Sequence, residues 1–320
     1  MTDNLPSVTV LIPSPPDLAD VQAVAAARAL DYPADKLEIL VVRGRQPSVQ
    51  RNAGMKAARG DLIYFLDNDS VAPPESLRRA VPHFADAKVK IVGGPNLCPP
   101  DAPELEQIFA LVLGSFALAS SRARYTSVGQ VRATGEKELI LCNLLARRDT
   151  MLELGGFNEA LYPNEENALM DAIQKRGDKL LYDPELIVHR RPRKSMKSFA
   201  RMLMNYGRGR AEQFREYPTF GSVLNFVPPL FLVYLVVVLP AVFFLTPFAL
   251  VPLGLYAVAV VLQVLALMPR GGVARSLGAL PFIVMTHVLY GFGFWRGLFT
   301  KLETPGEKVT VPVTIEKITK

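Results

Sequence analysis

The chain of 320 residues is poor in the side chains that form disulfides or bind zinc, because it contains two cysteines and three histidines. Cys98 and Cys142 show no metal-ligand spacing, and the histidines are scattered along the sequence. This composition argues against a disulfide framework and against a zinc site. Carboxylates are therefore the ligands that we expect for any metal ion.

Charged side chains are missing from two long stretches near the C-terminus. No Asp, Glu, Lys or Arg occurs from Tyr217 to Met268, and a second charge-free stretch runs from Ser276 to Trp295. A bilayer core of about 30 Å takes about 20 helical residues. The first stretch is thus long enough for two membrane spans and the second for one, and their lack of amphipathic character disfavours a buried soluble hairpin.

The N-terminus does not resemble a signal peptide, because "MTDNLPSVTVLIP" has neither a basic segment nor a long apolar run. We therefore expect the first 215 residues to stay in the cytosol, with the chain in the inner (cytoplasmic) membrane as a multi-pass protein. Two spans would return the chain to the cytosolic side at "PRGGVARS", where Arg270 and Arg275 satisfy the positive-inside rule.

The third apolar segment carries conflicting signals. A third crossing would place the tail after Lys301 outside, although the basic excess of that tail favours the cytosol. Pro281, His287 and the glycines of "YGFGFWRG" suit a bent or re-entrant helix. Because the charge-free length matches the bilayer core, we expect three spans.

The first part of the chain has the pattern of an α/β domain. Apolar runs that read as buried strands occur at 7–13, 37–44, 61–66 and 89–94, and a longer one at 179–190. Helical segments separate them, including an Ala-rich stretch at 17–33, a helix stopped by Gly60, and "EENALMDAIQKRG". This alternation predicts a mostly parallel sheet that binds ligands at the carboxyl ends of its strands.

A basic neck follows this domain. From His189 to Arg215 the sequence holds nine Lys or Arg and one acid, Glu212, with apolar residues at helical spacing among them. Such a helix is expected at a membrane surface, and positive-inside flanking explains the same cations. The formal net charge of +6 comes largely from this neck, so it does not indicate nucleic-acid binding.

Two aspartates stand at the end of an expected strand in "YFLDNDSVAPP". Asp67 and Asp69 are two positions apart, so on an extended backbone their carboxylates point to the same side and repel each other. A solvated turn is one explanation. A divalent cation held between the two carboxylates, with a phosphate as a further partner, is the other.

Four motifs occur in order between Ser7 and Arg215, namely "VTVLIP", "QRNAGMKAARGDLIYFLDNDS", "NLLARRDTMLELGGFNEAL" and "PNEENALMDAIQKRG". Followed by a basic neck and apolar segments, they resemble a membrane-bound family 2 glycosyltransferase with the GT-A fold. The succinoglycan and exopolysaccharide-type transferases of lipid-linked sugars resemble it most. The resemblance implies a Rossmann-like GT-A domain over 1–190, a membrane-interface neck over 191–220, transmembrane helices over 221–300 and a tail over 301–320.

The resemblance also implies a metal and a donor site. Asp69 would coordinate Mg²⁺ or Mn²⁺, and Asp67 would face the metal or the ribose and sugar. The residues implied in binding the nucleotide-diphosphate sugar are Pro13, Arg51, Asn52, Asp67 and Asp69. For Arg51, an exposed helix arginine is the alternative from the residues alone.

On the acceptor side, the resemblance implies a general base that deprotonates the acceptor hydroxyl, with inversion at the anomeric carbon. Glu165 and Glu166 are the candidates, and Glu166 is favoured, although carboxylates at a helix start are common in any protein. Candidate contacts to the acceptor or to phosphates are Gly156, Phe157, His189, Arg190 and Arg193.

Two departures from the family pattern bear on the function. Relatives carry Asp after the second strand, where this chain has "VVRGRQPSV", and Arg43 cannot accept hydrogen bonds from a base. The Gln-x-x-Arg-Trp motif of processive synthases is also missing. We expect transfer of one sugar to a lipid-linked saccharide; synthesis of a polyprenyl-phosphate sugar and a catalytically weakened membrane scaffold are the alternatives.

Overall fold

The computed structural model describes residues 5–159, 165–216, 218, 220–239, 247–302 and 312–320. The chain divides into two compact units. The first comprises Met1–Pro99, Ser120–Arg191 and Glu303–Lys320, and the second comprises Pro100–Ala119 and Pro192–Leu302. The segment 100–119 thus joins the apolar C-terminal helices, although the sequence places it inside the α/β domain.

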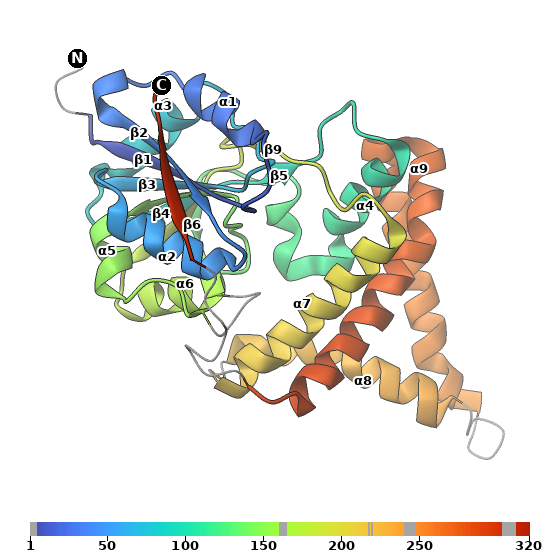
Figure 1. Cartoon of the computed structure of the whole chain (residues 1–320). Helices are drawn as coiled ribbons and strands as arrows, with labels where there is room; N and C mark the ends of the chain where they lie inside the picture. Colours follow the sequence, from blue (N-terminus) through green and yellow to red (C-terminus); the bar gives the residue numbers. More distant parts are fainter. Residues whose placement is uncertain (1–4, 160–164, 217, 219, 240–246, 303–311) are drawn as a thin grey trace. The chain divides into compact units, whose positions relative to one another are not determined.

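The first unit is built on an eight-stranded sheet (Figure 1). The strands of this unit are β1 Val8–Ser14, β2 Leu37–Arg43, β3 Leu62–Leu66, β4 Val89–Gly93, β5 Asn96–Leu97, β6 Arg132–Thr134, β7 Asn143–Arg147, β8 Lys179–Tyr182, β9 Val188–His189 and β10 Thr314–Ile318. Strands β5 and β9 form a separate two-stranded sheet. The order across the large sheet is β10-β2-β1-β3-β7-β4-β8-β6. Five strands, β1 to β4 and β8, run in one direction, and β6, β7 and β10 run against them.

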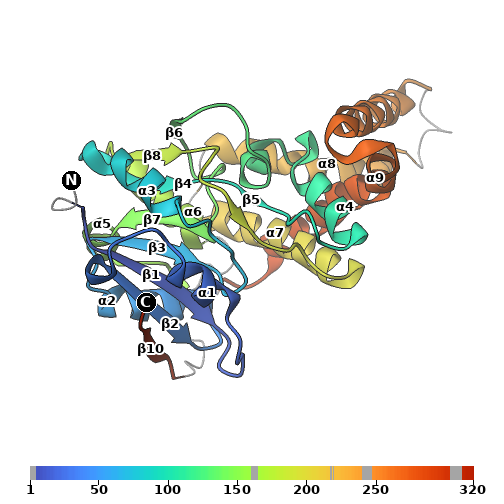
Figure 2. The same cartoon turned by 90° about the horizontal axis from the view of Figure 1, so that it is seen from above.

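Helices cover both faces of this sheet (Figure 2). The helices of the first unit are α1 Gln22–Arg28, α2 Pro47–Ala57, α3 Ser76–Ala80, α5 Arg148–Glu153 and α6 Glu165–Lys175. Residues of α1 and α3 pack into one apolar core, which includes Val10 and Leu66. Residues of α2, α5 and α6 pack into a second core, which includes Leu11 and Phe65. Alternate residues of β1 and β3 therefore face opposite cores, as the pleat requires.

The predicted α/β fold is confirmed, with two local differences. Residues 143–147 form β7, a buried strand between β3 and β4, whereas the sequence pattern was read as the start of a helix and loop. The expected strand 179–190 is divided into β8 and β9 by a turn in which the Leu186 N–H bonds to the Asp183 carbonyl. Short apolar runs do not distinguish strand from helix, which explains the first error.

The C-terminal tail forms an edge strand of the same sheet. β10 pairs antiparallel with β2, with Thr314 opposite Arg43 and Ile318 opposite Ile39. The Arg28 guanidinium also donates to the Thr319 carbonyl at 3.0 Å. This contradicts the expectation of a tail across the membrane from the α/β domain, because one sheet cannot have strands on both sides of a bilayer.

The second unit is helical, with α4 Glu104–Leu113, α7 Met196–Glu216, α8 Val227–Val233 and α9 Val251–Phe299. Within the described residues, one helix, Phe248–Phe299, is long and apolar enough to cross a membrane, and Val223–Val238 is a shorter apolar helix. Gly272, at φ 71°, interrupts α9, so two helical segments meet there. The three separate spans expected from the sequence are therefore not reproduced.

The amphipathic character of α7 is confirmed, but its apolar side faces protein. Phe199 and Leu203 are fully buried, and the Phe199 ring stacks on Phe109 of α4 with 4.1 Å between centroids. A Cβ added at Gly207 would meet the Tyr290 carbonyl of α9. The apolar stripe that suggested lipid contact is thus covered by α4 and α9.

Candidate active site

The two aspartates of the sequence motif lie directly after β3 at the carboxyl edge of the parallel strands. Asp67 follows Leu66, and the Ser70 N–H bonds to the Asp67 carbonyl at 3.0 Å, which closes a turn. The exposed fraction of the side chain is 21% for Asp67 and 42% for Asp69. The turn explains how the chain presents both carboxylates at one point, so the solvated-turn and cation-site explanations are compatible.

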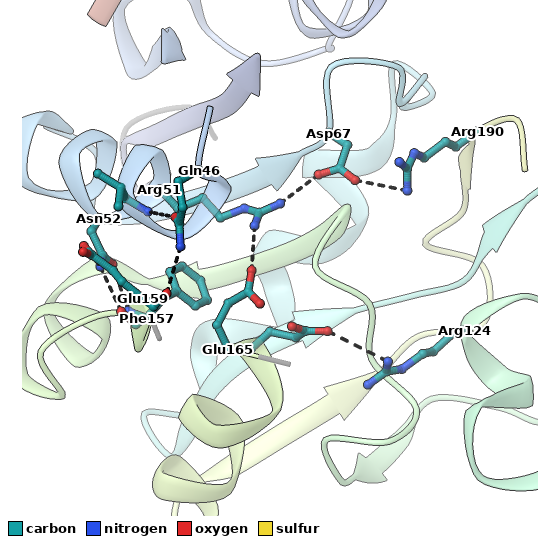
Figure 3. Close-up of polar contacts among 11 residues, drawn as sticks. Gln46, Arg51, Asn52, Asp67, Arg124, Phe157, Glu159, Glu165 and Arg190 are labelled. Carbon is teal, nitrogen blue, oxygen red and sulfur yellow. Dashed lines mark hydrogen bonds and ion pairs between the residues drawn. The ribbon is translucent and has the colours of Figure 1, made fainter. Parts of the chain in front are cut away.

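Arg190 neutralises this pair of carboxylates. Its Nη1 lies 3.1 Å from Asp67 Oδ2, and its Nε donates to Asp69 Oδ1 at 2.6 Å (Figure 3 shows the contact to Asp67). Burial lowers the pKa of Arg190, but Asp67, Cys142 and Asp69 outweigh that effect, so the pKa stands well above its usual value. The guanidinium is therefore a permanent cation at the place where the sequence predicted a metal ion.

Arg51 joins the aspartates to the second acidic motif. It projects from α2, is 6% exposed, and donates from Nη2 to Asp67 Oδ1 at 2.9 Å and from Nη1 to Glu165 Oε1 at 3.1 Å (Figure 3). The alternative of an exposed helix arginine is thereby excluded. A continuous chain of charges runs from Glu165 through Arg51 and Asp67 to Arg190.

The two glutamates at the start of α6 have different surroundings. The Glu165 side chain is 3% exposed and pairs with Arg51. The Glu166 side chain is 16% exposed, and its Oε1 lies 4.0 Å from Nη1 of Arg124. Arg124 is itself held by Asn167 Oδ1 at 2.6 Å. Glu165 is thus fixed within the ion-pair chain, while Glu166 has the more accessible carboxylate.

Asn52 points toward the "GGFN" loop. Its side chain accepts from the Phe157 N–H at 2.8 Å and donates to the Phe157 carbonyl and to Glu159 Oε1, both at 2.9 Å (Figure 3). Gly156 has φ 79°, and a Cβ there would lie 2.5 Å from Asn52 Oδ1. The Phe157 ring packs edge-on against Phe65, with centroids 5.5 Å apart. Asn52 therefore anchors the predicted acceptor loop, and its side-chain amide is occupied there.

The remaining predicted residues have different positions. Pro13 is buried in β1, opposite Val42 of β2. His189 lies in β9, where its backbone exchanges hydrogen bonds with Val71 at 2.8 and 2.9 Å. Arg193 is exposed and belongs to the second unit. Of the three basic residues predicted to contact the acceptor or phosphates, Arg190 is the one that lies beside Asp67 and Asp69.

Several site residues were not found from the sequence. Arg124 lies among polar residues without a motif, and Gln46 caps α2 through the Val49 N–H while donating to the Glu159 carbonyl at 2.9 Å. Cys142 is buried beside Arg190, and burial raises the pKa of its thiol to about 12. No local spacing identifies such partners, because the contacts join segments that are distant in the sequence.

The donor atoms at Asp67 and Asp69 fit a hard divalent cation. Carboxylate oxygens are the ligands that Mg²⁺ and Mn²⁺ prefer, usually with substrate phosphate oxygens completing the set. The described residues contain no group of three or more His, Cys, Asp or Glu arranged for a metal ion, so the protein alone supplies an incomplete set. The bound guanidinium of Arg190 shows that this point attracts positive charge.

The sheet order, the acidic turn after β3 and the helices on both faces define a GT-A glycosyltransferase fold. In agreement, the mannosyltransferase PcManGT from Pyrobaculum calidifontis, solved with GDP-Man and Mn²⁺, superposes with a TM-score of 0.55. The alignment covers 93% of this chain and 88% of that protein at 18% sequence identity. At that identity the likeness concerns the fold alone.

Sequence comparisons also find similarity to glycosyltransferases. Residues 23–107 match the model of the family described as glycosyl transferase family 2. The chain is 25% identical over 179 residues to the pre-mycofactocin glycosyltransferases of two Mycobacterium tuberculosis strains, CDC 1551 / Oshkosh and ATCC 25618 / H37Rv. That match covers 54% of this chain and 36% of each relative, so the chain spans about a third of their length.

Proposed function

We propose that the chain is an inverting glycosyltransferase. It moves one sugar from a nucleotide-diphosphate sugar to a lipid-linked saccharide at the cytosolic face of a membrane. The observation that carries the proposal is the charge chain of Glu165, Arg51, Asp67, Arg190 and Asp69 at the carboxyl edge of the sheet. Ligands of α/β sheets bind at this edge.

Each group has a defined task in the proposed reaction. Arg51 fixes Asp67 by a buried ion pair, and Asp67 and Asp69 would hold Mg²⁺ or Mn²⁺. When bound, the divalent cation supplies Lewis acidity that neutralises charge on the diphosphate leaving group. Arg190 lies beside both aspartates and donates hydrogen bonds to diphosphate oxygens, since a guanidinium recognises phosphates well.

Glu166 is the proposed general base. Its carboxylate takes the proton of the acceptor hydroxyl while the acceptor oxygen bonds to the anomeric carbon, and the bond from that carbon to the phosphate oxygen breaks. The nucleoside diphosphate leaves with the bonding electrons, and one displacement inverts the configuration. Arg124 and Asn167 hold the start of α6 in place, and Asn52 fixes the acceptor loop.

The test is a transfer assay with purified full-length chain in detergent, a panel of nucleotide sugars and Mn²⁺. Acceptors are lipid-linked saccharides, polyprenyl phosphate and, because of the named relatives, pre-mycofactocin. We expect Glu166→Gln to reduce transfer to a saccharide hydroxyl by about 10²-fold or more. A phosphate acceptor is already ionised, so unchanged transfer to polyprenyl phosphate by this variant would favour that acceptor instead.

A further inference from the structure

Exposed large apolar side chains of the second unit are most frequent on two of its helical segments, 223–238 and 251–271. Large exposed side chains there include Val236 at 72%, Leu255 at 66% and Leu262 at 59%. Water-soluble monomers rarely expose an apolar surface of this extent. Segment 251–271 spans about 30 Å at the rise of an α-helix, which matches a bilayer core. Lipid hydrocarbon is therefore the occupant that fits this surface.

The break in α9 at Gly272 lies against α4, which follows the first unit closely in the sequence. Arg275 Nε donates to Glu104 Oε1 at 2.8 Å, and a Cβ at Gly271 would meet the side chain of Leu111. Glu104 begins α4 shortly after Pro99, where the chain leaves the first unit. Charges on both sides of the break are costly to move through hydrocarbon. The break is therefore expected outside the hydrocarbon layer.

The second half of α9, residues 273–299, packs along the cationic helix α7. Added Cβ atoms at Gly293 and Gly297 would meet the carbonyls of Met204 and Arg208, so the two helices are in backbone contact. This spacing of small residues permits a close helix crossing. Since α7 carries Arg201 and Arg210 on a surface that cannot enter hydrocarbon, residues 273–299 lie at the same depth as α7.

The edge strand β10 fixes the position of the chain after the apolar unit. It pairs with β2 over five residues and holds the chain end to the sheet unit. Both ends of the apolar unit thus stand on one side of the bilayer, which allows only an even number of crossings. We propose that the segments 223–238 and 251–271 cross the bilayer as a hairpin. In this proposal α4, α7 and residues 273–299 lie at its cytosolic surface, an arrangement that rests on the membrane attachment proposed above.

Cysteine labelling in cells with a permeabilised outer envelope tests this arrangement. The background is the full chain with Cys98→Ser and Cys142→Ala, checked for wild-type thermal unfolding, and single cysteines replace Phe248, Val273 or Phe299, all exposed in the structure. With a membrane-impermeant maleimide, we expect labelling at Phe248 only, and labelling of the other two after the inner membrane is broken. Labelling at Phe299 or Val273 in intact cells would overturn the proposal, as would protection of all three positions.

This readout is independent of transferase activity. Recovery of the chain in the carbonate-washed membrane fraction tests membrane attachment by itself, so failure of the proposed function and failure of the hairpin are distinguishable. A chain released by carbonate would overturn the hairpin together with membrane attachment. A chain retained there with Phe299 labelled in intact cells would overturn the hairpin alone.

Arg43 is the last residue of β2. Its Nε donates to Glu316 Oε1 of β10 at 2.6 Å, and its Nη1 donates to the carbonyl of Leu18, after β1, at 2.7 Å. No partner of Nη2 is found in the described part of the chain, and the side chain is 19% exposed. The guanidinium thus stands at the ligand edge of β1 and β2 with one donor group to spare.

We infer that Glu316 positions Arg43 to donate to a carbonyl oxygen of the nucleobase, which rests on the proposed function. The C-terminal strand then completes the donor site by fixing a guanidinium at the ligand edge of the sheet. Lys317 on the same strand pairs with Glu38 at 3.0 Å and offers a matched control. Substitution of Lys317 removes an ion pair of β10 and leaves the hydrogen bonds of Arg43 in place.

Calorimetric titration of the full chain in detergent with UDP and with GDP, in Mn²⁺, tests this role. We expect Glu316→Gln to weaken binding of the preferred nucleotide about tenfold, the size of one lost charged hydrogen bond. Lys317→Gln should stay within about twofold of wild type. Equal effects of the two variants, or none, would overturn the role of Glu316. Absence of nucleotide binding by the wild type would instead reject the proposed function.

Discussion

Replacing Arg51 by Met perturbs the charge chain at its most buried cation. Arg51 is 6% exposed and pairs with Asp67 at 2.9 Å and Glu165 at 3.1 Å, and Met keeps most of the apolar stem. Removing one partner of a buried ion pair costs about 3–5 kcal/mol. Because Asp67 keeps Arg190 at 3.1 Å, we expect the lower end, about 3 kcal/mol.

The assay is pulse proteolysis of the full chain across a urea gradient, with the first unit detected by an N-terminal tag. The control is Arg59→Met, just after the same helix, where the exposed side chain predicts a change within about 0.5 kcal/mol. Adding Glu165→Gln to Arg51→Met should restore part of the loss, because the buried carboxylate is then neutral. A cost of Arg51→Met close to that of the control would refute the buried ion-pair reasoning.

Three further predictions follow from the geometry. Asp69→Ala should leave unfolding by urea unchanged but abolish the Mn²⁺-dependent part of nucleotide binding by calorimetry; retained Mn²⁺ dependence would contradict the metal assignment. Burial raises the pKa of Asp183, but hydrogen bonds from Arg79 and the Glu185 N–H outweigh it, so the folded pKa is lowered. Its stabilisation is therefore present above the unfolded pKa of about 3.9 and is lost as pH falls through the lower folded value. Asp183→Asn should accordingly destabilise the chain at pH 7 and flatten its acid denaturation, and an unchanged slope below pH 4 would count against this. Gly207→Leu should separate α7 from α9 and lower the thermal midpoint in detergent, whereas Gly254→Leu, at an open position, should not.

Much of the sheet could be predicted because its strands are short apolar runs bounded by turns. The run 62–66 is buried throughout and ends at Asp67, as the sequence suggested. Strand β7 is less apolar, with Asn143 and Arg147 at its ends, and it is followed at once by the helix α5, so its local pattern was ambiguous. Its place between β3 and β4 depends on pairing across the sheet, which local periodicity does not encode.

The site was predictable in its residue types and less so in its contacts. The pairing of Arg51 with Glu165 joins positions 114 residues apart, and no spacing rule identifies it. Asn52 was assigned to the donor by its neighbour Arg51, yet adjacent helix residues point in different directions, and it holds the Phe157 loop. The glycines of "YGFGFWRG" suggested a poor helix, whereas in the structure Gly293 is where α7 approaches. Their role became visible only with the partner helix.

The proposed function requires the acidic edge of the sheet to bind and activate a nucleotide sugar. The most direct measurement is release of nucleoside diphosphate from a panel of nucleotide sugars by the purified full-length chain, with Mn²⁺ and with EDTA. We expect at least one donor to be turned over with Mn²⁺. We expect EDTA or Asp69→Ala to reduce the rate by about 10²-fold or more, the loss of one strong electrostatic contact in the transition state. Turnover that persists at the wild-type rate in Asp69→Ala, or a complete failure to bind any donor, would contradict this expectation.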